Sequence, residues 1–268
     1  MTDHLAALRE RQQQFVATIP LVDAATRVPW CGRWKVRNLV EHLARVHHWA
    51  AGQARRRAEV ALGRGPFELV PFYSTQADEL FDTLSELDPD APAWALSDDG
   101  LPKDQRTGTV RFWHRRQALE TLVHLWDLRT AGGLDYEPGI DAWSDCLDEV
   151  FTVMHPRQLR LARIAPPVLQ VRFVAADADA EHHLAGAPPE ADQVTVSGTV
   201  RSLALLAWGR LPLADPALTI TGDEVALRAV LEAGLTPCRA ISCRVCAGAE
   251  GWMNPDGSTA TLTENPFG

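Results

Sequence analysis

Residues 113–127 read WHRRQALETLVHLWD, and our prediction of the fold starts from the helical pattern of this stretch. The apolar side chains of this region recur with the period of an α-helix and form one core stripe, made of Phe112, Leu119, Val123 and Trp126. Glu120 and His124 project together from a narrow arc beside this stripe, because they stand four residues apart. The stretch therefore predicts a helix over about residues 110–130 that presents a carboxylate and an imidazole side by side.

Residues 34–49 read WKVRNLVEHLARVHHW and predict a second helix, over about 36–62. His42 lies on the shoulder of its apolar stripe, a position that faces a neighbouring helix. His47 lies within the stripe, which indicates a hydrogen-bonded core histidine rather than a ligand. Further helices are predicted over about 3–18, with Asp3 as N-cap, and over about 74–87 and 140–154. Long helices with one apolar stripe each are typical of an up-and-down bundle.

The pattern changes after the Ala165-Pro166-Pro167 break. Segments 168–174, 193–196 and 218–221 alternate like half-buried strands, and helical runs follow Thr199 and Asp223, which can cap them. We therefore predict an α+β fold, in which an up-and-down helical bundle over 1–163 is followed by a small α+β domain over 164–235. Residues 236–268 are predicted to form a Cys-containing C-terminal extension.

The amino-acid composition excludes some classes of protein and disfavours some kinds of partner. Hydrophobic residues make up 46% and charged residues 23% of the chain, which excludes a disordered or fibrous protein. The formal net charge is −9, from 26 basic and 35 acidic residues, and disfavours nucleic acid or an anionic membrane as partner. The N-terminal segment carries charges where a signal peptide needs an apolar run, and no stretch approaches 18 apolar residues, so we expect a cytoplasmic protein. The oligomeric state is left open.

The histidine and glutamate pattern indicates a metal site. Glu120 and His124 would supply two ligands from one helix, and His42 is placed to supply a third from a facing helix. Two imidazoles and one carboxylate suit a divalent transition metal and leave a position for water or substrate, with zinc, iron and nickel all open. The alternative is a chance Glu-x-x-x-His pair on a solvated helix face. Tryptophans in both segments favour burial, and a buried glutamate and histidine need partners.

Spaced motifs carry a family resemblance. In the first half they are Trp34-x-Val36-Arg37-x-Leu39-Val40-x-His42-Leu43-Ala44-x-Val46-His47-x-Trp49 and Trp113-x-x-Arg116-x-x-x-Glu120-x-x-x-His124-x-x-Asp127. They resemble the mycothiol-dependent maleylpyruvate isomerase family, within the DinB-like metalloproteins. Further on, Val194-x-Val196-x-Gly198, Trp208-Gly209-Arg210 and Ile220-x-Gly222-Asp223 look like that family's sterol-carrier-protein-like C-terminal domain.

The resemblance implies a DinB-like bundle whose metal ligands are His42, Glu120 and His124, with a divalent metal, zinc foremost, and mycothiol as cofactors. It implies an enzyme in which a metal-bound thiolate attacks a small electrophile, either to isomerise a maleylpyruvate-like acid from cis to trans or to conjugate the thiol. One alternative is a mycothiol S-transferase of detoxification or natural-product biosynthesis, which would share the metal-site residues. An alternative of another class is a non-catalytic metal-binding regulatory or scaffold protein.

Two further residues are candidate catalytic groups. Asp127 would take the thiol proton or orient the ligands, and otherwise it is a helix charge that pairs with Arg116 or Arg129. Arg210, in a loop after a helix, would clamp a carboxylate of substrate or thiol and so contribute to cofactor binding. Its alternative role is a charge that complements the dipole at a helix C-terminus.

The cysteines fall into two groups. Cys238, Cys243 and Cys246 have the spacing C-x4-C-x2-C and form a candidate second metal or redox site, or otherwise belong to a poorly packed extension. Cys31 and Cys146 lack such spacing and are predicted to be apolar-like fillers. The remaining histidines without partner spacing are predicted at the surface, namely His48, His114, His155, His182 and His183.

Overall fold

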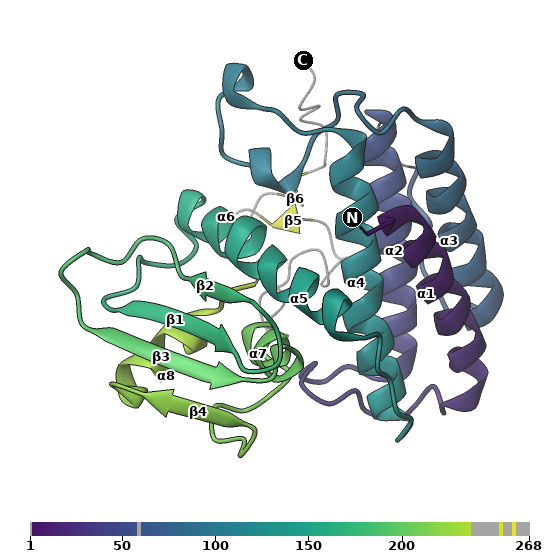
Figure 1. The fold of residues 1–268 in the computed structure, drawn as a ribbon. Coiled ribbons are helices and arrows are strands. Elements are labelled where there is room, and N and C mark those ends of the chain that lie inside the picture. The colour runs from purple at the N-terminus through teal and green to yellow at the C-terminus, as the bar shows by residue number, and fades with distance from the viewer. Residues whose placement is uncertain (1, 58–59, 237–251, 254–258, 261–268) are drawn as a thin grey trace. The chain divides into compact units, whose positions relative to one another are not determined.

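The computed structural model describes residues 2–57, 60–236, 252–253 and 259–260. The described chain divides into two compact units. One comprises Met1–Ala95, Thr107–Tyr136 and the described residues 252–253 and 259–260, and the other comprises Leu96–Arg106 and residues 137–236. Figure 1 shows a helical unit and a unit that contains a sheet. The predicted α+β class, a helical bundle followed by a small α+β domain, is confirmed.

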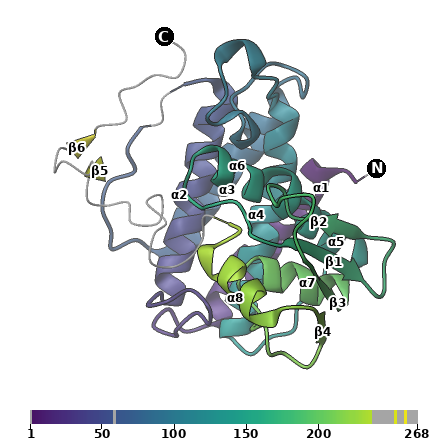
Figure 2. The same cartoon turned by 90° about the vertical axis from the view of Figure 1, so that its left-hand side faces the viewer.

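Four long helices build the first unit. They are α1 (His4–Thr18), α2 (Val36–Arg55), α3 (Leu69–Glu86) and α4 (Val110–Ala131), and they lie side by side (Figures 1 and 2). Helix α2 packs on α3 and α4, and α1 packs on α4 and α3. A short 3-10 helix, Ile19–Leu21, follows α1. Each helix thus buries one face against two neighbours, which is the bundle that the 3.6-residue period predicts.

Local interactions explain where these helices begin and end. The Asp3 carboxylate accepts hydrogen bonds from the backbone N–H groups of Leu5 and Ala6, so Asp3 is the N-cap as predicted. Helix α2 ends at Arg55, well before residue 62, because Arg56 adopts a left-handed conformation with φ of 57°. Helix α3 begins at Leu69, earlier than predicted, and Pro71 lies in its first turn, where proline removes no intrahelical hydrogen bond.

Aromatic rings close one part of the bundle core. Trp113 of α4 is fully buried, and its indole N–H donates to the carbonyl of Trp94 at 2.7 Å. The Trp49 ring of α2 lies edge-on to Trp113, with 5.2 Å between ring centroids. A second cluster further along the bundle joins Phe15, Leu39, Leu43, Tyr73 and Leu125. These contacts fix α4 against α2 and α3, so side chains between them are held in place.

The second unit surrounds a four-stranded sheet of order β2-β1-β3-β4. The strands are β1 (Gln170–Ala175), β2 (Glu181–His183), β3 (Gln193–Gly198) and β4 (Leu218–Thr221), and only β1 and β3 pair in parallel. Helix α7 (Val200–Ala207) packs on β1, β3 and α5 (Ile140–Glu149). The remaining elements of this unit are a π-helical turn Val150–Met154, α6 (His155–Arg160), α8 (Glu224–Ala233) and the 3-10 turns Leu96–Asp98 and Lys103–Gln105. The short strands β5 (Trp252–Met253) and β6 (Thr259–Ala260) pair with each other and are grouped with the first unit.

The predicted strands around 168–174, 193–196 and 218–221 are present as β1, β3 and β4. Strand β2 was not predicted, because Glu181–His183 is polar throughout and has no apolar alternation. The boundary between the compact units falls near residue 136. Helix α5 belongs to the second unit because it packs on α7. Asp99 belongs to the same unit, since its Oδ2 accepts a hydrogen bond from Nη2 of Arg157 in α6 at 2.6 Å. The domain boundary at residue 163, in the sense of separately folding parts, stays a prediction.

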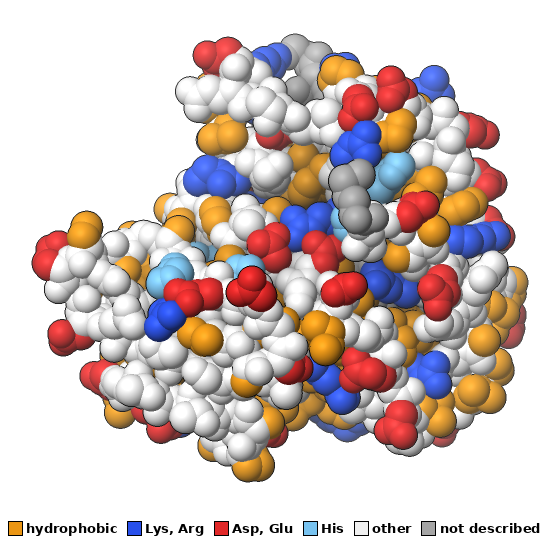
Figure 3. Space-filling model, viewed as in Figure 1, with side chains coloured by type: hydrophobic (Ala, Val, Ile, Leu, Met, Phe, Trp, Pro, Cys, Tyr) orange, Lys and Arg blue, Asp and Glu red, His pale blue; other side chains and the backbone are white. Residues whose placement is uncertain are grey.

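Acidic and basic side chains are interspersed on the face of the molecule shown in Figure 3. Among the described residues, no helix is both long enough and apolar enough to cross a membrane.

The N-cap of α1 gives a prediction about stability. Asp3→Ala removes the acceptor for two otherwise unpaired N–H groups, so we expect the free energy of unfolding to fall by about 1 kcal/mol in urea denaturation. Asp3→Ser keeps a side-chain acceptor and should lose much less. An equal loss in both variants would contradict the capping role.

Candidate metal centre

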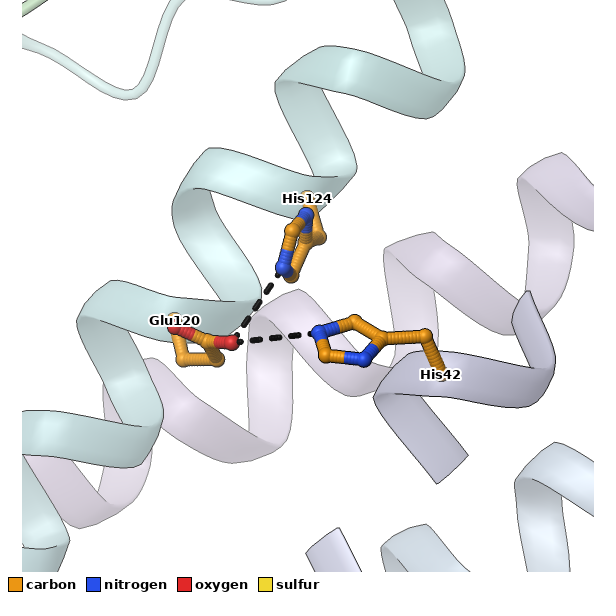
Figure 4. A group of neighbouring side chains, drawn as sticks. All are labelled: His42, Glu120 and His124. Carbon is orange, nitrogen blue, oxygen red and sulfur yellow. Dashed lines mark hydrogen bonds and ion pairs between the residues drawn. The ribbon is translucent and has the colours of Figure 1, made fainter. Parts of the chain in front are cut away.

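His42, Glu120 and His124 meet inside the first unit. Figure 4 shows Glu120 and His124 extending from α4 toward His42 of α2. Oε1 of Glu120 lies 3.2 Å from Nε2 of His124 and 3.7 Å from Nε2 of His42. All three side chains are buried, and their ligand atoms lie within 4.8 Å of one another. The structure therefore brings together the three side chains that the sequence predicted as ligands.

The local sequence explains this arrangement. Glu120 and His124 are four residues apart on α4, so they lie one above the other on the same face. That face is covered, because nearly every residue of α4 from Trp113 to Leu128 is buried. The two imidazole rings of His42 and His124 lie almost perpendicular, with 5.1 Å between their centroids. Donor atoms from two helices thus converge on one point in the interior of the bundle.

Glu120 is ionised in this environment. Burial alone would raise the pKa of its carboxyl group, but the Arg116 guanidinium and His124 hold that pKa well below its usual range. Arg116 stands one turn before Glu120, and its guanidinium donates a hydrogen bond to Oε2. Oε1 therefore remains the oxygen that faces both imidazoles.

Asp127 fixes the orientation of His124. Its Oδ2 lies 3.0 Å from Nδ1 of His124, so Nδ1–H donates to the carboxylate and Nε2 points toward Glu120. Burial disfavours the charged imidazole, yet Glu120 and Asp127 raise the pKa of His124 to about 9. In the absence of a metal, the His124 side chain is then an imidazolium held between two carboxylates.

The donor set fits a divalent metal ion. Nε2 of His42 is buried and makes no hydrogen bond, and Oε1 of Glu120 at 3.7 Å is beyond hydrogen-bond distance. A buried nitrogen without a hydrogen bond is costly unless it has a ligand. Two imidazole nitrogens and one carboxylate oxygen are the donors of a three-ligand site with an open position. Within the described residues, this is the one group of His, Cys, Asp and Glu side chains compact enough to hold an ion.

The other candidate residues have different surroundings. Asp127 is fully buried beside His124, a position suited to the orienting role. Arg210 lies in the second unit, where it is buried and donates from Nη1 to the carbonyl of Trp208 at 2.7 Å. Its role toward a substrate carboxylate stays a prediction. The predicted site of Cys238, Cys243 and Cys246 falls outside the described residues.

The burial of three further histidines can be compared with the positions that the sequence predicted for them. His47 is a hydrogen-bonded core residue, as predicted, because Nδ1 bonds to Oε1 of Gln117 and Nε2 to the Tyr73 hydroxyl. Burial lowers the pKa of His47 to about 4, so it is neutral. The prediction that His114 and His155 lie at the surface is wrong, since both are buried. Burial lowers the pKa of each.

Three residues that support the site were not identified from the sequence. Arg116 contacts Glu120, and its i, i+4 spacing was a signal that could have found it. The Trp34 ring lies 4.9 Å from the His42 ring, centroid to centroid. Cys31 contacts Asp127, which is 96 residues further along the sequence, and no local sequence pattern indicates a contact between segments so far apart.

The fold and the site define a helical bundle with a candidate metal centre in its core, linked in sequence to a small α+β unit. Residues 5–129 match the family described as mycothiol maleylpyruvate isomerase N-terminal domain, and residues 138–229 match the C-terminal domain of the same family. The chain belongs to the mycothiol-dependent maleylpyruvate isomerase family.

Two solved structures share this fold. One is the crystal structure of the mycothiol-dependent maleylpyruvate isomerase, which is 15% identical, with a TM-score of 0.57. The likeness covers 81% of this chain and 91% of that one. The other is a variant of that isomerase with one histidine replaced by alanine, and its values are the same. No curated protein matches the sequence.

The geometry predicts metal binding that depends on both helices. We expect about one divalent ion per chain, and binding at least about tenfold weaker in His42→Ala and Glu120→Ala, measured by chelator competition. His48→Ala is a matched control, because His48 lies on the same helix but pairs with Glu79. Wild-type affinity in both ligand variants would rule out this site.

The raised pKa of His124 predicts that metal binding releases a proton. With a pKa of about 9, the metal-free imidazole is protonated at pH 7, and it must lose that proton to become a ligand. Calorimetry in buffers of different ionisation enthalpy should therefore show release of about one proton at pH 7. The apparent affinity should weaken about tenfold for each pH unit below 9 and level off above it. Binding at pH 7 without proton release would contradict this account.

Proposed function

We propose that this protein is a metal-dependent enzyme that uses mycothiol to isomerise a small electrophilic acid of the maleylpyruvate type. The observation that carries the proposal is the buried Nε2 of His42, which makes no hydrogen bond and faces Glu120 and His124 within a chain of this family. The mycothiol-dependent isomerase that shares the fold supports the same activity. His42, Glu120 and His124 would hold the metal, with zinc as the first candidate.

The proposed reaction needs a thiolate at neutral pH. A divalent ion bound here would supply Lewis acidity, since coordination of a thiol sulfur lowers the pKa of that thiol. Mycothiol bound here would supply a nucleophile for reversible addition to the conjugated cis double bond, with the electron pair of the π bond taken up by the conjugated carbonyl group. Return of that electron pair with departure of the thiolate would leave the trans double bond and unchanged thiol.

The residues of this chain would hold the reacting groups in place. Arg116 keeps Glu120 ionised and holds its Oε2, and Asp127 keeps Nε2 of His124 directed toward the ligand position. This orienting role of Asp127 is favoured over transfer of the thiol proton, because its carboxylate is already hydrogen-bonded to Nδ1 of His124. We propose that Arg210 binds a carboxylate of the substrate or a polar group of mycothiol, since an acid needs local cations on a chain of net charge −9.

Two other functions remain alternatives. A mycothiol S-transferase would use the same metal ligands and would retain the bond between sulfur and electrophile. A non-catalytic metal-binding regulatory or scaffold protein would retain the centre without turnover. We propose a cytoplasmic location on the sequence argument, and Cys238, Cys243 and Cys246 remain a candidate second metal or redox site.

A thermal-shift titration tests for the thiol. Mycothiol should raise the melting temperature of the zinc-loaded protein, because a ligand that binds the native state stabilises it by about 2.7 kcal/mol at a hundred times its Kd. Mycothiol disulfide, which lacks a free thiol, is the matched control and should cause a much smaller shift. No shift with mycothiol, or the same shift in Glu120→Ala, would contradict a thiol held at this centre.

The fate of the thiol separates the two enzymatic functions. An isomerase turns over maleylpyruvate with free mycothiol constant, whereas an S-transferase consumes one thiol for each electrophile. Following free thiol and substrate absorbance in the same reaction distinguishes them. Metal binding without turnover of either kind would favour the non-catalytic alternative.

A further inference from the structure

The segment of residues 27–35, which we call the 27–35 loop, precedes α2 and is fixed by its own hydrogen bonds. A β-bridge joins Arg27 to Lys35, and the N–H of Val28 donates to the carbonyl of Trp34 at 3.0 Å. The Arg27 guanidinium donates to the carbonyl of Gly32 at 2.6 Å. Trp30 adopts φ of 66°, an unusual conformation for a residue other than glycine. A loop that is tied at both ends and strained in the middle holds defined positions.

Cys31 of this loop contacts Asp127, the residue that orients the proposed ligand His124. The residue is buried, and its Sγ lies 3.7 Å from Oδ2 of Asp127. The same oxygen lies 3.0 Å from Nδ1 of His124. The Cys31 S–H and the His124 N–H therefore donate to one carboxylate oxygen. Because Asp127 is fully buried, each donor helps to fix the direction of its carboxylate.

Trp34, three residues further along the loop, reaches the other histidine. Its ring lies 4.9 Å from the His42 ring, centroid to centroid, with an angle of 53° between the planes. The N–H of Trp34 donates to the carbonyl of Cys31 at 3.1 Å, which ties the two residues together. One short loop thus contacts His42 directly and His124 through Asp127.

We propose that the 27–35 loop positions both imidazoles of the metal centre, and that Cys31 is a positioning residue that acts on His124 through Asp127. The inference rests on the proposed metal-dependent function and adds residues on which that function depends. Loss of the Cys31 donor leaves Asp127 freer to rotate, so the His124 ring is less well oriented for a metal. The description of Cys31 as a filler is then incomplete.

The expected effect is moderate. Replacing the hydrogen-bond partner of a metal-bound histidine typically weakens metal binding by about 10- to 100-fold. Cys31 stands one contact further out and is a weak donor, so we expect a loss of about threefold to tenfold. Asp127→Ala should cause the larger loss.

Four variants of the full chain test this role. Cys31→Ala and Cys31→Val remove the donor, and Cys31→Val leaves less empty space. Cys31→Ser keeps a donor. Cys146→Ala is the matched control, because Cys146 is also a buried cysteine outside any disulfide but lies in the second unit. The readouts are the zinc Kd by chelator competition, the visible absorption of the cobalt-loaded protein, and the unfolding midpoint of the metal-free protein.

We expect weaker zinc binding and an altered cobalt spectrum in Cys31→Ala and Cys31→Val. Cys31→Ser should restore both the zinc affinity and the spectrum toward those of the wild-type protein. Cys146→Ala should lose metal-free stability while keeping the wild-type Kd and spectrum. A wild-type Kd and spectrum in Cys31→Ala and Cys31→Val would overturn this inference alone. A wild-type protein that takes up neither ion would overturn the proposed metal centre, and this inference with it.

Discussion

The ionised carboxylate of Glu120, buried between α2 and α4, is the constraint on which the site depends. A charge in the interior is tolerated only where nearby groups compensate for it. Arg116 holds one oxygen, and the imidazoles of His124 and His42 approach the other. Arg116 and His124 lie one turn before and one turn after Glu120, so a single helix places most of this environment. Only His42 must come from elsewhere, and the packing of α2 against α4 brings it there.

Support for the centre extends outward in steps from this carboxylate. Asp127 orients His124, Trp34 packs on His42, and Cys31 is proposed to hold Asp127. A three-ligand site needs such support, because the open position leaves the ligands without a fourth protein group to fix them. The supporting residues also explain how a bundle with ordinary packing can keep several polar side chains in its core. Arg116 bonds to Glu120, Asp127 bonds to His124, and His47 bonds to Gln117 and Tyr73.

Local sequence pattern predicted the parts of the structure that local physics controls. The 3.6-residue period of the apolar side chains predicted the helices, and Asp3 predicted the start of α1. The i, i+4 spacing predicted that Glu120 lies beside His124 on one helix. Contacts between distant segments left no such signal, which is why Cys31 was assigned as a filler and the burial of His155 was missed. Strand β2 was not predicted for a related reason. Its own residues are polar, and it forms a strand because it pairs with β1.

X-ray absorption at the zinc edge, with and without mycothiol, tests whether His42, Glu120 and His124 hold a metal ion that also binds the thiol. We expect two imidazole nitrogens at about 2.0–2.1 Å and a carboxylate oxygen at about 2.0–2.2 Å in the zinc-loaded protein. Mycothiol should add one sulfur at about 2.3 Å, and His42→Ala should lose one imidazole contribution. A spectrum without imidazole scattering, or one unchanged in His42→Ala, would rule out these metal ligands, and a spectrum that gains no sulfur on addition of mycothiol would rule out a metal-bound thiol.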